Sequence, residues 1–146
     1  MKHMMGPGAK FLIGLGASLL AGWIAHGPLG QGEAFVSGLE RQAADVVRRS
    51  ELTTVQVRFP RDPLSREAIL SGTANDFQRE GQGLFPGIND RIRDMAGVSG
   101  LHWDEPGTQR RMMPLLLETE FLVFLAFLIG VGLGRLVFRP RREGFL

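Results

Sequence analysis

Two long apolar stretches, one near each end of the chain, constrain the fold more than any other feature of the sequence. The first covers residues 11–29 and the second residues 114–138. A helix needs roughly 20 mostly apolar residues to cross the hydrocarbon core of a bilayer. The sequence therefore predicts two transmembrane helices that flank a polar segment, residues 30–113, which is long enough for one small folded domain.

The charges predict which side of the membrane each part occupies. The segment 30–113 carries 11 Arg and 12 Asp or Glu, so it is nearly neutral. Basic residues instead stand beyond the two stretches, toward the chain termini: Lys2, Lys10, Arg139, Arg141 and Arg142. Because basic flanks stay in the cytoplasm, we expect residues 1–10 and the tail 139–146 to be cytoplasmic. The domain then lies on the opposite side of the membrane, which is the periplasm if the protein belongs to the inner membrane of a bacterium.

A cleaved signal peptide is the alternative interpretation of the N-terminal stretch. Such a peptide also has a short basic start, an apolar run and then small residues. The chain contains no cysteine, which excludes disulfides and thiolate metal sites and leaves the redox compartment open.

Small residues recur at helical spacing in both apolar stretches. Gly14, Ser18 and Gly22 follow one another at every fourth position, and Gly130 and Gly134 share this spacing. A face of small residues lets two helices approach closely, which strengthens van der Waals contact in lipid. We expect these faces to dock the helices on each other or on a partner, although glycine is also generally common in membrane helices.

Aromatic and basic residues predict the depth of each helix in the membrane. Trp23 lies toward the outer end of the first stretch, where an indole ring suits the interface. Arg135 lies near the inner end of the second and can extend its charged end to the headgroups, as can the tail residues Arg139, Arg141 and Arg142. Trp103 either inserts at the outer interface or fills the core of the domain.

His26 is the one residue that suggests a cofactor. It follows Gly22 by four positions, so a small side chain and an imidazole lie on the same helix face, an arrangement similar to that of light-harvesting polypeptides. Such a site has room for a pigment or haem whose metal the imidazole ligates. Because Gly27 and Pro28 follow at once, we favour an unliganded histidine at the helix end, and we expect no cofactor.

The middle segment predicts an α+β domain. Residues 34–49 place Phe35, Leu39, Ala43 and Val46 at helical spacing, and residues 55–59 alternate between apolar and polar side chains like a strand. A second strand is expected at 67–71, and a second helix starts at an Asn75 cap. Residues 81–87 interrupt this helix, which resumes at residue 88 and ends at Gly97. Residues 98–103 form the last strand.

This order of helix, strand, strand, helix, strand resembles the BON domain, a small module of the bacterial envelope. The resemblance covers residues 35–104 and is carried by two phrases, Ala-Ile-Leu-Ser-Gly at 68–72 and Ala-Gly-Val-Ser-Gly-Leu at 96–101. The interruption at 81–87 departs from the continuous second helix of the family. The resemblance implies contacts with phospholipid or with other envelope proteins, and no catalysis.

No set of residues in the sequence has the spacing of an active site. His3, His26 and His102 are far apart, and no pair of side chains has metal-ligand spacing. The basic charge lies outside the domain, which argues against nucleic acid as a partner. We therefore expect a non-catalytic accessory subunit that braces neighbouring subunits of a respiratory or photosynthetic membrane complex. The alternative is an independent envelope-maintenance protein whose domain contacts phospholipid.

Overall fold

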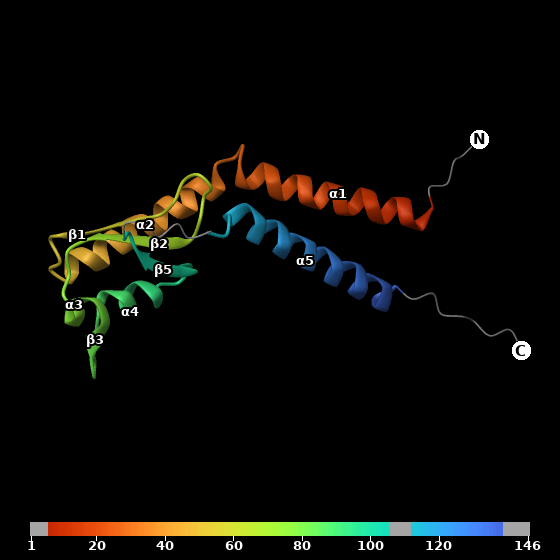
Figure 1. Ribbon diagram of the computed structural model, residues 1–146. Coiled ribbons are helices and arrows are strands. Elements are labelled where there is room, and N and C mark those ends of the chain that lie inside the picture. The colour runs from red at the N-terminus through yellow and green to blue at the C-terminus, as the bar shows by residue number, and fades with distance from the viewer. Residues whose placement is uncertain (1–5, 106–111, 139–146) are drawn as a thin grey trace, which may run out of the picture.

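The computed structural model describes residues 6–105 and 112–138. Two long apolar helices, α1 (Pro7–His26) and α5 (Leu115–Val137), lie side by side and run in opposite directions, and both extend from the same end of a small α+β domain (Figure 1). The expected α+β arrangement with one long helix at each end of the chain is thus confirmed. Among the described residues these are the two helices that are long and apolar enough to cross a membrane.

Both long helices have 20 residues or more, but α1 is displaced along the chain from its expected position. It begins at Pro7 because proline suits the first turn of a helix, where its missing N–H costs nothing. It ends at His26, three residues before the expected boundary, and the N–H of Gly27 caps it by donating to the Trp23 carbonyl. The bounds of α5 agree with the expected 114–138 within one residue.

Helix α2 (Gln31–Arg49) begins directly after the turn that follows α1. Gly30 has a φ of 68°, a left-handed conformation that glycine adopts without strain. The helix expected to begin at residue 34 therefore begins earlier, at Gln31. The buried stripe also differs from the expected one, because Phe35 is 45% exposed and the inward positions are Val36, Leu39, Ala43 and Val47.

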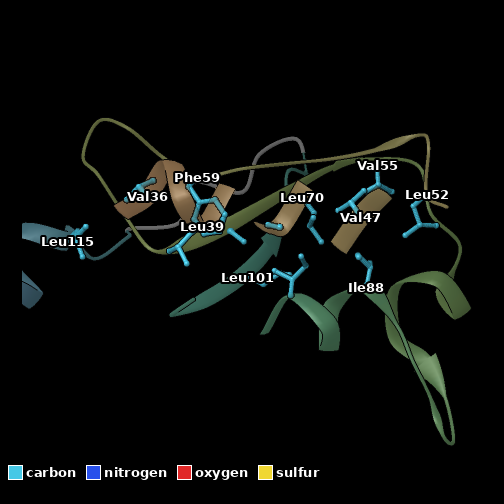
Figure 2. Packing of buried hydrophobic residues seen from close by; sticks show 13 residues of the cluster. Val36, Leu39, Val47, Leu52, Val55, Phe59, Leu70, Ile88, Leu101 and Leu115 are labelled. Carbon is cyan, nitrogen blue, oxygen red and sulfur yellow. The ribbon is translucent and has the colours of Figure 1, made fainter. Parts of the chain in front are cut away.

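The domain contains a three-stranded mixed sheet with the order β1-β2-β5. The two expected strands are present as β1 (Val55–Arg58) and β2 (Glu67–Gly72), which pair antiparallel with Val57 opposite Leu70. Strand β5 (Gly100–Trp103) pairs parallel with β2. Figure 2 shows buried side chains of the sheet meeting those of α2 and α4 in one cluster, which includes Leu70 and Ile88.

Between β2 and β5 the chain forms two short helices separated by a β-hairpin. Helix α3 (Asp76–Glu80) begins at the expected Asn75 cap, whose side chain and that of Gln78 form a capping box. The interruption at 81–87 is a hairpin of β3 (Gly81–Gln82) and β4 (Phe85–Pro86). Helix α4 (Ile88–Arg93) ends earlier than expected, before Gly97. A turn follows it, in which the Val98 N–H donates to the Met95 carbonyl.

The small core makes the domain sensitive to cavities. Leu70 is fully buried at the centre of the sheet, so Leu70→Ala is expected to lower the free energy of unfolding of the domain by about 2–5 kcal/mol. Urea denaturation of the detergent-solubilised chain, followed by tryptophan fluorescence, measures this change. Gln56→Ala in the neighbouring strand β1 is the control, because Gln56 is exposed and its loss is expected to have little effect.

Candidate functional site

A cavity of about 690 Å³ lies where the long helices join the domain, and we call it the elbow cavity. Its walls come from the end of α1, the start of α2 and the first two turns of α5. The larger apolar side chains that line it are Phe35, Met113, Leu115, Leu117, Phe121 and Leu122. The polar side chains that line it are His26, Gln31, Arg66, Glu118 and Thr119.

One wall of the elbow cavity depends on close packing between His26 and Gly32. The imidazole of His26, the last residue of α1, lies against the buried Gly32 in the first turn of α2. A Cβ at position 32 would lie 2.6 Å from Cε1 of the ring, which is too close for any real contact. Glycine at this position therefore allows α1 and α2 to meet, and His26, at the end of α1 as expected, is half-buried at this junction.

The opposite side of the junction is joined by an ion pair between Arg66 and Glu118. The Nε of Arg66 donates to Oε2 of Glu118 at 2.5 Å, and Nη1 donates to the Gly97 carbonyl at 3.0 Å. Nearby, the N–H of Leu115 donates to the carbonyl of Leu64 at 2.7 Å. Glu118 lies in the first turn of α5, where the helix dipole favours a negative charge. These bonds connect the loop before β2 to the start of α5.

The expected small-residue face of α1 lies against α5. A Cβ on Gly14 would meet the ring of Phe127 at 3.2 Å, and one on Gly22 would meet Oε1 of Glu120 at 2.9 Å. Ser18, between them, donates its hydroxyl to the Gly14 carbonyl within the helix. The helices can approach here because glycine leaves room for the larger side chains of α5.

The small residues of α5 do not take part in this contact. Among the described residues, no atom beyond the chain neighbours and the backbone of α5 itself lies within 4 Å of a Cβ placed on Gly130 or Gly134. The two faces that share one spacing in the sequence therefore differ in the structure, since one packs on the neighbouring helix and the other does not.

Trp103 packs within the domain. Its Nε1 donates to Oδ1 of Asn89 at 2.9 Å, and Cζ of Arg79 lies 4.0 Å from the centroid of its ring. The ring is half-buried against the core cluster. Of the two alternatives for this residue, its contacts agree with the core position.

The remaining interface residues lie at the positions expected along the helices. Trp23 is 51% exposed in the last part of α1, and Arg135 is exposed near the end of α5. Three further basic residues lie outside the described part of the chain: Arg139, Arg141 and Arg142.

A second apolar feature lies at the other end of the domain, and we call it the hairpin patch. Between residues 31 and 105, all of which the structure describes, the exposed large apolar side chains are Phe35, Phe77, Leu84 and Phe85. Phe35 lines the elbow cavity, whereas the other three belong to the β3–β4 hairpin and the adjacent helix α3. Leu84, at the hairpin turn, is 96% exposed. Figure 1 shows this hairpin on the end of the domain that faces away from α1 and α5.

Sequence reasoning missed both the Arg66–Glu118 pair and the hairpin patch. The two charged residues are 52 positions apart, and neither has a pattern around it that predicts a partner. The available signal for the hairpin patch was the pair Leu84 and Phe85 between glycines, because large apolar residues in a tight turn have no core to enter.

Several polar side chains of the domain form pairs with one another. His102 Nδ1 lies 3.1 Å from Oε1 of Glu67, and Arg58 pairs with Asp104. Within residues 6–105 and 112–138, no group of three His, Cys, Asp or Glu side chains is placed to hold a metal ion. No family model, curated protein or solved structure matches the chain.

The contact between His26 and Gly32 can be tested with a double-mutant cycle. Gly32→Ala is expected to lower the free energy of unfolding by about 1–3 kcal/mol, because the added Cβ displaces the imidazole. In a His26→Ala background the same change is expected to cost clearly less, since the obstructing ring is gone. Thermal unfolding of the four chains in detergent measures the coupling, and an equal cost in both backgrounds would contradict this packing.

The contact between α1 and α5 gives a second prediction. Gly22→Leu is expected to destabilise the helix pair by about 1–3 kcal/mol through overpacking against Glu120 and Val123. Gly130→Leu is the matched control on the other small-residue face, and we expect it to leave the melting temperature of the purified chain unchanged. A similar loss for both variants would mean that Gly22 has no special role in the contact.

Proposed function

We propose that the protein is a non-catalytic accessory subunit of a larger complex in the bacterial inner membrane. In this proposal α1 and α5 span the membrane, residues 1–10 and 139–146 are cytoplasmic, and the domain lies in the periplasm. Apolar helices of a water-soluble protein are normally buried, whereas Leu12, Leu20 and Leu136 on α1 and α5 are all more than half exposed. The basic residues near both chain ends support this orientation.

The hairpin patch is the observation that carries the partner-binding part of the proposal. Phe77, Leu84 and Phe85 expose apolar surface that contributes nothing to the core, and such patches are characteristic of interaction sites. The patch faces away from α1 and α5 (Figure 1), so the membrane that holds these helices is on the other side of the domain. We therefore assign the patch to a neighbouring protein subunit on the periplasmic side.

Two further features support a subunit role. The face of α5 with Gly130 and Gly134 is not used by α1, so it is open to a helix of another subunit. The resemblance of residues 35–104 to BON domains is consistent with an envelope protein that contacts other proteins. Respiratory and photosynthetic complexes are the hosts we propose.

The elbow cavity favours a second candidate function, contact of the domain with phospholipid. If α1 and α5 span the membrane, this cavity lies at the level where the bilayer ends and the domain begins. An independent envelope-maintenance protein would use such a contact without a protein partner.

Capture of partner proteins tests the subunit proposal. Membranes from the native host are solubilised gently, the chain is captured through a C-terminal tag, and the bound proteins are identified and quantified by mass spectrometry. The unmodified chain is expected to retain partners in fixed stoichiometry. The double variant Leu84→Ser and Phe85→Ser is expected to capture at least about tenfold less partner protein, because central apolar contacts dominate the energy of interfaces.

Gln42→Ser is the control for this experiment, because Gln42 is exposed on α2 and lies outside the hairpin patch. It is expected to capture the same partners as the unmodified chain. If the unmodified chain is recovered alone, the subunit proposal is wrong. If the hairpin variant captures as much as the control, the hairpin patch is not the surface that binds the partner.

A further inference from the structure

We infer that the elbow cavity holds one acyl chain of a zwitterionic phospholipid, whose headgroup lies against Arg66 and Glu118. This inference rests on the proposed membrane position of α1 and α5, but it does not depend on the hairpin patch or on any protein partner.

The size and lining of the cavity suit an acyl chain. Its volume of about 690 Å³ lies within the range of about 300–1000 Å³ that is usual for sites binding small molecules. Phe35, Met113 and Leu117 come from different parts of the chain, are 45%, 61% and 57% exposed, and all line the same space. Apolar surface that converges on one cavity is favourable to cover with a hydrocarbon chain.

The position of the cavity indicates where its occupant comes from. The cavity is lined by the last turn of α1, through Ala25 and His26, and by the first turns of α5, from Leu115 to Leu122. In a membrane-spanning helix pair these turns lie at the boundary between hydrocarbon and headgroups. A phospholipid of the surrounding leaflet therefore has its chain and its headgroup at the right depths to enter from the side.

The polar side of the cavity indicates the charge of the headgroup. Arg66 has more N–H donors than its bonds to Glu118 and Gly97 use, and a guanidinium matches phosphate oxygens well. Glu118 places a carboxylate next to it, with 17% of its side chain exposed. An anionic headgroup would satisfy Arg66 and be repelled by Glu118. A headgroup with both a phosphate and an ammonium, such as phosphatidylethanolamine, complements both residues.

Native mass spectrometry of the full chain tests the inference. The purified chain is reconstituted in nanodiscs that contain equal amounts of phosphatidylethanolamine and phosphatidylglycerol with identical acyl chains. Protein ions that retain one lipid are then counted. The unmodified chain is expected to retain one phospholipid and to prefer phosphatidylethanolamine. Leu117→Trp is expected to lower retention at least about tenfold, because the indole fills the space that the acyl chain needs.

Leu133→Trp is the matched control, because Leu133 is 56% exposed on the same helix and lies far from the cavity. It is expected to retain lipid like the unmodified chain. The double variant Arg66→Gln and Glu118→Gln removes both charges and keeps a polar side chain at each position, so it is expected to bind lipid without a headgroup preference. This variant tests the headgroup contact even if Leu117→Trp does not fold.

The outcomes separate this inference from the subunit proposal. Equal retention by Leu117→Trp and Leu133→Trp, or no preference for phosphatidylethanolamine in the unmodified chain, overturns the inference whatever the result of partner capture. Selective retention that is lost in the cavity variant supports the inference even if the chain is recovered without partners. Carbonate extraction of membranes tests the anchoring on which both rest, and release of the chain into the soluble fraction would overturn both.

Discussion

The attachment of α5 to the domain depends on the ion pair between Arg66 and Glu118 and on the hydrogen bond beside it. The short turn at residues 27–30 connects α1 to α2. The connection from β5 to α5 is longer, and part of it lies outside the described residues. The pair, with the hydrogen bond from Leu115 to Leu64, holds the start of α5 against the loop before β2. A half-buried pair of this kind is costly to break, because the remaining partner keeps an unbalanced charge.

This junction also explains why the two ends of the domain differ. At the elbow, apolar side chains surround a cavity that is also lined by two oppositely charged residues, Arg66 and Glu118. The hairpin patch at the far end is exposed, and its hairpin, residues 81–87, contains no charged residue. In the proposed membrane arrangement, the first surface would meet lipid and the second would meet a neighbouring protein subunit. The two proposed contacts are therefore compatible, because each uses a different surface and a different kind of ligand.

Local sequence patterns predicted most of the elements, since each depends on neighbouring residues. The two apolar stretches, the Asn75 cap and the alternation at 55–59 all led to the observed helices and strands. The rotation of α2 was predicted wrongly, because Phe35 and Val36 fit a helical stripe equally well. The sheet decides between them: it buries Val36, and it leaves Phe35 in the wall of the elbow cavity.

The sequence by itself determined the two membrane-length helices, the α+β order between them and the small-residue faces, because hydrophobicity, periodicity and capping act over a few residues. Only the tertiary structure decided that Gly14 and Gly22 pack on α5 while Gly130 and Gly134 do not, and that His26 closes over Gly32. It also decided that Arg66 meets Glu118 across 52 residues of sequence. Such contacts depend on how complete elements fit together in space, and no local pattern of residues records that fit.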